Sequence, residues 1–484
     1  MGEYYIKTNR IFTRVRSYIW ILTPLVAIGG IFEKKLGLLI PPIMLTLIVM
    51  SFFRGRYWCG NFCSHGSFYD KYLLKISRNK KIYDFLNSKI VMVVFFTWFM
   101  FNITRKLIAA VNSFGTSMFL DDLGYVFTSA YLMVLVLGGL ISIINSPRAW
   151  CKVCPMGIMQ KGSYKLGDAL NITTKTDRVL TIDSKSKCHL CGKCARVCPM
   201  QLEPYLNFDS DNRFISNECI KCSTCVKNCP ASILSFENNH THLVNIKKRE
   251  KSSIIDMREE NEGTITKINK YSHNVIGLEI KLNSDIEKIP GGYILLKIQD
   301  SPLQYRAYTV AKYIDDNTLE VIIKLEEKGY GTNIIFKEFR EGYTTTIKGP
   351  IEGEISKIDK VEKALFIAGG IGFTPFIELI NRVLKEDKGE VTMLHAARYE
   401  GDLIYNNYFE EVGAKENGFK YIPVLSRDKN TLYDKGSVVE KLQDIKDIKD
   451  YKIYVCSSNR LANSIEEKLI SLGVDKENLF IESL

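Results

Sequence analysis

The residues with the clearest capacity for chemistry are cysteines, of which the 484-residue chain has 13. Residues 188–199 and 219–230 both read C-x2-C-x2-C-x3-C-P. In such a run, three thiolates bind one [4Fe–4S] cubane and the fourth reaches a second one. The expected ligand sets are Cys188, Cys191, Cys194 and Cys229 for one cluster, and Cys219, Cys222, Cys225 and Cys198 for the other. Zinc is the alternative, but zinc motifs do not usually repeat four-cysteine sets that end in Cys-Pro.

Four further cysteines form a second repeat, with a spacing of about 90 residues between its halves. The pairs are Cys59 with Cys63 and Cys151 with Cys154, and each is preceded by Trp and followed by Gly. Since iron–sulfur clusters need four such ligands, we expect these thiolates to close around a third cluster. Buried free cysteines near helix ends are the alternative. His65, two residues after Cys63, is either a polar neighbour or a substitute ligand.

The segments that position this second repeat are apolar. Uncharged stretches cover residues 17–32, 36–53, 90–104 and 123–147. The second and fourth are long enough to span a bilayer, whereas the first and third are short for a span. Lys and Arg gather before the first stretch and between residues 54 and 89, while the opposite loops carry few. This asymmetry predicts four crossings, with both cysteine pairs on the cytoplasmic side of a multi-pass cell-membrane protein.

Composition argues against several classes of function. The net charge is +11, but Lys and Arg are spread along the chain without an arginine-rich arm, so no nucleic-acid partner is expected. None of the six histidines lies in an apolar stretch. A membrane haem normally needs paired axial His, so no haem is expected in the apolar part. Cysteines that bind clusters need a reducing compartment, which places the redox domains in the cytoplasm.

A charged linker at residues 247–251 separates the cysteine-rich part from the rest. From 260 to 355, short runs of alternating apolar and polar residues predict an antiparallel β-barrel. After 361, apolar strands alternate with helical segments, which is typical of a doubly wound α/β unit. The barrel segment carries Arg306-Ala-Tyr308-Thr309, and the α/β segment opens with a glycine-rich loop at 369–375. Glycines between a strand and a helix let the backbone approach a pyrophosphate.

Three parts of the chain resemble known families. About the first 165 residues resemble the membrane ferredoxin-type proteins of periplasmic nitrate reduction and nitrous-oxide regulation, although Ser64 replaces a Pro of that motif and the second pair is spaced C-x2-C. Residues 182–240 resemble bacterial two-cluster ferredoxins. Residues 260–484 resemble the ferredoxin–NADP reductase family, in particular the electron-transfer subunits of dihydroorotate dehydrogenase and anaerobic sulfite reductase.

These resemblances imply the fold class and the domains. The chain is expected to be multidomain, with a four-helix transmembrane domain that carries the cysteine-pair repeat, an α+β two-cluster ferredoxin domain, a flavin-binding antiparallel β-barrel and a doubly wound NAD(P)-binding α/β domain. The expected boundaries, in that order, are 1–170, 182–245, 258–355 and 356–484.

The last resemblance also implies roles for site residues. Arg306 would hold the flavin pyrophosphate, Tyr308 would pack on the flavin, and Thr309 would lie near its reactive N5 atom. The remaining residues of the cofactor sites would be Gly331, Thr332, Gly369, Gly370, Gly372, Thr374 and Pro375.

Cys456 matches the family's cysteine near the nicotinamide, but Ser457 and Ser458 replace the usual Gly-Pro, so a buried strand-end thiol is an equal alternative. The family implies FAD rather than FMN. Arg398 and Arg427 are candidates to contact a 2′-phosphate, so the choice between NADH and NADPH stays open.

Together these parts predict an electron route. NAD(P)H gives two electrons as hydride and clusters accept one at a time, so a flavin must stand between them. The expected order is NAD(P)H, flavin, two ferredoxin clusters and the third cluster, with a quinone or a redox partner protein as acceptor at the membrane. Flow from a membrane donor to NAD(P)⁺ is an alternative. A redox sensor without turnover is another, although no DNA-binding or signalling module accompanies it.

Overall fold

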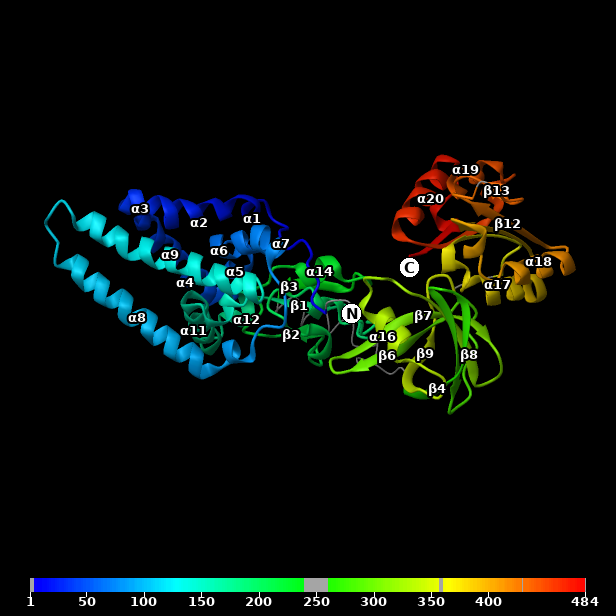
Figure 1. Cartoon of the computed structure of the whole chain (residues 1–484), viewed down its shortest axis with the longest axis horizontal. Coiled ribbons are helices and arrows are strands. Elements are labelled where there is room, and N and C mark those ends of the chain that lie inside the picture. Colours follow the sequence, from blue (N-terminus) through cyan, green and yellow to red (C-terminus); the bar gives the residue numbers. More distant parts are fainter. Residues whose placement is uncertain (1–3, 239–259, 357–359, 429, 484) are drawn as a thin grey trace. The chain divides into compact units, whose positions relative to one another are not determined.

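The computed structural model describes residues 4–238, 260–356, 360–428 and 430–483 (Figure 1). They form two compact units, which we call the N-terminal unit (4–238) and the C-terminal unit (260–483). The charged linker expected at 247–251 lies outside the described residues.

The N-terminal unit contains four helical stretches that are long and apolar enough to cross a membrane, among the residues described: Arg14–Phe32, Lys34–Arg54, Lys89–Val111 and Phe119–Ile144. The last two are α8 and α9, and the second is a 3-10 turn followed by α4 (Ile40–Arg54). The first and third stretches are 19 and 23 residues long. They exceed the uncharged runs expected there because charged residues at their ends join the helices.

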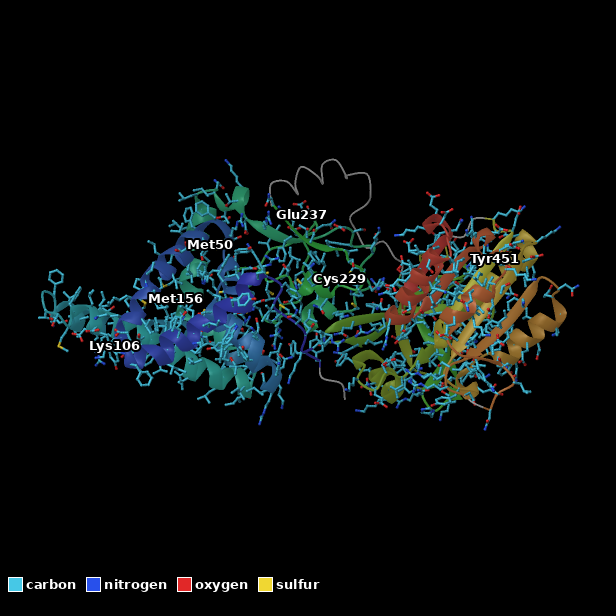
Figure 2. All side chains as sticks on the ribbon, turned by 90° about the horizontal axis from the view of Figure 1, so that it is seen from above. Met50, Lys106, Met156, Cys229, Glu237 and Tyr451 are labelled. Carbon is cyan, nitrogen blue, oxygen red and sulfur yellow. The ribbon has the colours of Figure 1, made fainter. Side chains whose placement is uncertain are left out.

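Two helices follow each helical pair and carry the second cysteine repeat. They are α5 (Tyr57–Asn61) and α6 (Ser64–Phe68) after the first pair, and α10 (Trp150–Val153) and α11 (Pro155–Ala169) after the second. Pro155 begins α11, where its missing N–H leaves no helical hydrogen bond unmade. Helix α11 packs against α4, with Met156 on the former and Met50 on the latter (Figure 2). This packing fixes both halves of the repeat on one bundle.

The ferredoxin segment of the N-terminal unit is built on a small antiparallel sheet in the order β2-β1-β3. Its strands are β1 (Arg178–Ile182), β2 (Arg213–Phe214) and β3 (Leu234–Asn238). Strand β1 begins before residue 182, where the ferredoxin domain was expected to start. One short helix lies within each cysteine run, α13 (Lys193–Arg196) in the first and α14 (Thr224–Asn228) in the second. Leu180, Ile182 and Phe214 form the core of this segment.

The first half of the C-terminal unit is a closed six-stranded antiparallel barrel in the order β4-β5-β8-β7-β6-β9, which confirms the predicted barrel. Its strands are β4 (Glu260–Ser272), β5 (Val275–Leu282), β6 (Tyr293–Asp300), β7 (Leu303–Tyr313), β8 (Thr318–Lys324) and β9 (Thr344–Ile351). Alternating Ile, Leu and Val side chains point inward from every strand and fill the barrel. Helix α16 (Tyr330–Glu338) joins β8 to β9.

The second half is a six-stranded parallel sheet in the order β13-β12-β11-β10-β14-β15. The strands are β10 (Lys363–Gly369), β11 (Glu390–Ala397), β12 (Phe419–Leu425), β13 (Asp434–Lys435), β14 (Lys452–Ser457) and β15 (Leu479–Ser483). One face packs on α17 (Phe376–Arg382) and α18 (Asn406–Lys415), and the other on α19 (Val438–Lys441) and α20 (Asn459–Ser471). Strand order reverses at β10, where ligands bind in such sheets.

Candidate functional site

The four cysteines of the first expected set line one cavity in the ferredoxin segment, together with Ile182, Tyr205 and Phe208. Cys229, labelled in Figure 2, reaches this cavity from the second run. The structure therefore brings together three sulfurs of one run and the last sulfur of the other. Apolar side chains complete the wall, which is the low-dielectric surrounding that influences a cluster's reduction potential.

Backbone conformation repeats between the two runs and explains how the sulfurs turn inward. The residues just before and just after the second cysteine have positive φ in both runs, Leu190 and Gly192 in one and Lys221 and Ser223 in the other. For non-glycine residues this conformation is strained and is kept where the surroundings require it. The same local fold is thus built twice.

The second expected set is also drawn together. Burial, together with the charges of Cys198 and Cys222, raises the pKa of Cys219 to about 12. The same two cysteines act on Cys225 in the same direction. Within the described ranges, no three His, Cys, Asp or Glu side chains lie close enough to hold a single metal ion. The ligands of a cubane bind four separate irons, so they stand around a cavity rather than at one point.

The cysteines of the second repeat converge as well. Cys59 and Cys151 are buried in one cluster of side chains with Met200 and Ile220. Burial, together with the charge of Cys59, raises the pKa of Cys63 to about 12. Burial and the charges of Cys151 and Cys59 likewise raise the pKa of Cys154 to about 12. All four side chains therefore lie near one another.

This third set adjoins the ferredoxin segment. Cys198 and Cys222, from the second ferredoxin set, pack against the cluster that contains Cys59 and Cys151. A Cβ atom added at Gly60 would lie 1.9 Å from the Ile220 carbonyl oxygen, so only glycine permits this approach. The geometry thus places the repeat cysteines directly beside one end of the ferredoxin segment.

Two arginines that cysteine spacing did not reveal contact this third set. Arg56 lies 4.0 Å from Cys59 Sγ, and Arg148 lies 3.7 Å from Cys151 Sγ. Gln160 donates from Nε2 to Cys59 Sγ at 3.2 Å. A sequence signal existed, because Arg stands three residues before the first cysteine in both halves of the repeat.

His65 does not stand out as a ligand. Its Nε2 lies 3.3 Å from the Tyr131 carbonyl oxygen, and its ring packs on the Tyr131 ring at 4.2 Å between centroids. Burial lowers the pKa of His65 to about 4, so the ring is neutral at physiological pH. This arrangement fits the expectation of a polar neighbour.

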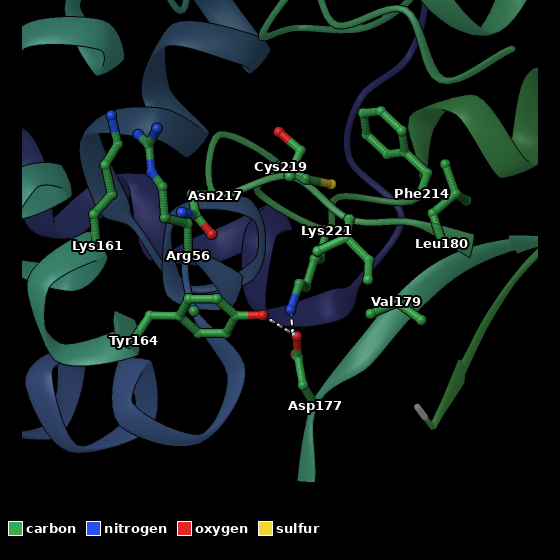
Figure 3. A pocket seen from close by; sticks show the side chains of 13 residues that line it. Arg56, Lys161, Tyr164, Asp177, Val179, Leu180, Phe214, Asn217, Cys219 and Lys221 are labelled. Carbon is green, nitrogen blue, oxygen red and sulfur yellow. Dashed lines mark hydrogen bonds and ion pairs between the residues drawn. The ribbon is translucent and has the colours of Figure 1, made fainter. Parts of the chain in front are cut away.

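A pocket at the junction of the helices and the ferredoxin segment is lined by Cys219 and by three polar side chains, those of Tyr164, Asp177 and Lys221 (Figure 3). Asp177 accepts a hydrogen bond from Tyr164 Oη at 2.9 Å and forms an ion pair with Lys221. Lys221 also donates to the Arg54 carbonyl oxygen at 3.0 Å. These contacts tie the second cysteine run to the end of α4.

In the barrel, strand β7 carries Arg306, Tyr308 and Thr309. Arg306 donates to the Tyr305 carbonyl oxygen at 2.8 Å, and a Cβ atom added at Gly331 would lie 2.8 Å from Arg306 Nε. The structure thus brings Arg306 and Gly331 together. Burial raises the pKa of Tyr308 well above its ordinary value, so its hydroxyl stays protonated.

Thr332 follows Gly331 in the first turn of α16. Its Oγ1 accepts a hydrogen bond from the Glu326 backbone at 3.2 Å. This bond closes the loop that leads into α16 and holds the helix start beside Arg306. Arginine with backbone N–H groups is a suitable donor set for a pyrophosphate.

The glycine-rich loop lies at the carboxyl end of β10, where the strand order reverses. Gly370 has φ +60°, and a Cβ atom added at Gly372 would lie 2.0 Å from the Cys456 carbonyl oxygen. Cys456, on β14, is buried and pairs in register with Ala368 of β10. Thr374 and Pro375 complete the turn into α17. The expected loop residues and Cys456 are therefore adjacent.

Two further side chains at this loop were not foreseen from the sequence. His395 is fully buried, and its Nε2 lies 3.0 Å from the Gly370 carbonyl oxygen; burial lowers its pKa to about 4. Glu482 pairs in register with Cys456, and burial raises its pKa above the ordinary carboxyl range. A lone His or Glu on a strand gives no motif, so only the fold reveals them. Arg398 follows β11 and Arg427 follows the adjacent strand β12, and the Arg427 backbone N–H donates to the Arg398 carbonyl oxygen at 3.0 Å.

Comparison with known protein families matches each part of the chain to a domain family. The sequence matches the oxidoreductase FAD-binding domain over residues 262–355 and the oxidoreductase NAD-binding domain over 366–467. It matches the 4Fe–4S dicluster domain over 180–230. A 4Fe–4S binding domain matches both halves of the second repeat, at 36–83 and 128–173.

Similar proteins include reductases of several pathways. The CDP-6-deoxy-L-threo-D-glycero-4-hexulose-3-dehydrase reductase of Yersinia pestis is 23% identical over 339 residues, which are 69% of this chain and 97% of that protein. The naphthalene 1,2-dioxygenase system ferredoxin–NAD(P)⁺ reductase component of Pseudomonas putida is 22% identical, over 46% of this chain and 68% of its own length. A ferredoxin NADP⁺ reductase structure from Neisseria gonorrhoeae has 17% identity and a TM-score of 0.41, covering 46% of this chain and 98% of that one.

The chain therefore joins 4Fe–4S ferredoxin domains to FAD-binding and NAD-binding domains of the ferredoxin-reductase type. This set of domains is that of an NAD(P)H oxidoreductase.

Proposed function

We propose that this iron–sulfur flavoprotein, an NAD(P)H oxidoreductase, carries electrons from NAD(P)H through flavin and three [4Fe–4S] clusters to an acceptor at the membrane. The observation that carries the proposal is the adjacency of Cys59 and Cys151 to Cys198 and Cys222. It supports a continuous relay from the second ferredoxin set to a set held at the ends of the apolar helices. The twelve cysteines of the three sets are the proposed ligands.

The entry point lies in the C-terminal unit. We assign the flavin pyrophosphate to Arg306 and the α16 start at Gly331 and Thr332, with Tyr308 and Thr309 toward the ring system. Gly369, Gly370, Gly372, Thr374 and Pro375 hold the nucleotide, with Cys456 beside them. Bound FAD would accept a hydride from NAD(P)H and release electrons singly. Burial keeps the Tyr308 hydroxyl and the Cys456 thiol protonated there, since it raises both pKa values.

The membrane assignment rests on the four apolar helices. Only 6% of the apolar window of α8 and 17% of that of α9 are buried, so these helices leave most of their apolar surface uncovered. Lipid is the solvent that suits such a surface. The acceptor is then a quinone or a redox partner protein. The similarity to the reductase component of the naphthalene 1,2-dioxygenase system favours delivery to a partner protein.

Metal and flavin content tests the proposal directly. Anaerobically purified full-length protein is expected to contain about twelve iron atoms and about one flavin per chain, because three cubanes hold four irons each. Iron and sulfide analysis together with flavin release and chromatography would measure this. About eight irons in fully loaded protein would remove the third cluster from the relay.

Arg306→Ala is expected to weaken flavin retention by about tenfold or more, since a charge-assisted contact to phosphate contributes roughly 1.5–3 kcal/mol. The measurement is flavin occupancy after dialysis, with rebinding followed by fluorescence. The cysteine sets lie in the other unit, so their iron content is expected to stay unchanged. Arg340→Ala, at an exposed loop of the barrel, is the matched control. Equal flavin affinity in the Arg306 variant and the unmodified protein would show that the pyrophosphate binds elsewhere.

A further inference from the structure

Arg56 and Arg148 occupy equivalent positions in the second repeat, which reads Arg56-Tyr-Trp-Cys59 in one half and Arg148-Ala-Trp-Cys151 in the other. Both side chains are buried, with exposed fractions of 2% and 0%. Arginine keeps its charge in proteins, so burial of a guanidinium requires negative charge or acceptors around it. Their repetition at matching positions points to a common task.

Each arginine contacts both halves of the repeat. Arg56 Nη2 lies 4.0 Å from the sulfur of its own half and donates to the Cys151 carbonyl oxygen at 2.8 Å. Arg148 Nη1 lies 3.7 Å from the sulfur of its own half and donates to the Cys59 carbonyl oxygen at 3.1 Å. Each arginine therefore contacts the sulfur of its own half and donates a hydrogen bond to the backbone of the other half.

The charges around this set do not balance among the side chains. Four buried guanidinium groups, those of Arg10, Arg16, Arg56 and Arg148, pair with two carboxylates, those of Asp70 and Glu218. Lys152 and Lys161 also approach Glu218, which increases the positive excess. An excess of buried positive charge is unfavourable without an anion. A cubane held by four thiolates carries about two negative charges when oxidised and about one more when reduced.

We propose that Arg56 and Arg148 join the two halves of the repeat around the third cluster and raise its reduction potential. The inference rests on the proposed function, because it requires that third cluster. Reduction by one electron from the neighbouring ferredoxin cluster, which is oxidised by one electron, adds a negative charge beside both guanidinium groups. Nearby positive charge stabilises the reduced state, and hydrogen bonds to the sulfurs act in the same direction. Gln160, fully buried with Nε2 on Cys59 Sγ, is a neutral donor of the same kind.

The test is a redox titration of full-length protein in detergent, followed by electron paramagnetic resonance. The third cluster's signal is identified as the one missing from Cys151→Ala. Arg56→Gln and Arg148→Gln are each expected to lower the ratio of reduced to oxidised third cluster about tenfold at a fixed potential, which corresponds to about 59 mV for one electron. Gln160→Met, which changes no charge, is expected to lower the ratio less. Arg54→Gln is the control, since Arg54 lies two residues from Arg56 and stacks on Tyr57 instead.

The outcomes separate the inference from the function it rests on. Absence of a third cluster from the unmodified protein would overturn both. A third cluster whose potential is unchanged in both arginine-to-glutamine variants would overturn the inference and leave the electron route intact. If a glutamine variant loses the third cluster, the lysine variant at the same position tests whether the positive charge of the arginine is what matters. Retention of the cluster at nearly normal potential in Arg→Lys supports charge compensation, and loss in both variants overturns the tuning role.

Discussion

Replacing Cys151 by Ala is expected to abolish NAD(P)H-dependent reduction of the membrane acceptor. Cys151 is buried beside Cys59 and packs with Cys198 and Cys222, so its loss removes a ligand of the proposed third cluster at the point where electrons leave the ferredoxin segment. The flavin and nucleotide residues lie in the other unit. Reduction of a small soluble dye, which takes electrons from flavin or ferredoxin clusters, should therefore continue at nearly the normal rate.

Both rates would be measured on the same membranes, with iron content and electron paramagnetic resonance on the purified variant. Val153→Ala is the matched control, because Val153 is buried in the same short helix and has no metal-binding group. It should retain both activities and all clusters. A Cys151→Ala protein with full iron and undiminished membrane activity would make these cysteines structural thiols and the helices a simple anchor.

The parts of the fold with a regular period were predictable from the sequence. Alternation of apolar and polar residues from 260 to 355 predicted the barrel, and runs such as 364–368 predicted the buried parallel strands. The repeated spacing of cysteines predicted that Cys229 of the second run lies with the first three cysteines of the first run, and these four side chains line one cavity. Strands and cysteine runs of this kind depend on local backbone geometry, which sets the spacing of residues along the sequence.

Contacts between distant positions were not predictable in the same way. Arg148 contacts Asp70, 78 residues away, and His395 on β11 contacts the Gly370 carbonyl oxygen at the end of the adjacent strand β10. No spacing rule links such residues, because their proximity is set by the packing of whole elements. The apolar helices illustrate a second limit. Uncharged runs underestimated the first and third helices, since charged residues at a helix end lengthen the helix without lengthening the apolar run.

Asp70→Asn is expected to destabilise the N-terminal unit by about 3–5 kcal/mol, the cost of removing one partner from a buried ion pair. The Asp70 side chain is fully buried, and its Oδ2 accepts from Arg148 Nη2 at 2.7 Å and Nε at 3.1 Å. Arg16 also contacts Oδ2, and Arg10 contacts Oδ1. Asparagine leaves three buried guanidinium groups without their carboxylate. Thermal unfolding of detergent-solubilised protein would measure the loss. Asp84→Asn, which breaks an exposed pair with Lys81, should change little.

The dependence of this loss on pH follows from the pKa of Asp70. Burial alone would raise that pKa, but the charges of Arg148, Arg16 and Arg10 outweigh burial and hold it well below the usual carboxyl range. A carboxylate with a depressed pKa in the folded state contributes its full stability above the unfolded pKa of about 3.9, and loses it as the pH falls below that value. The stability difference between the unmodified protein and Asp70→Asn should therefore be constant from about pH 8 to about pH 5. A difference that already shrinks between about pH 8 and pH 6 would mean that Asp70 is not the buried, ionised partner of the three arginines.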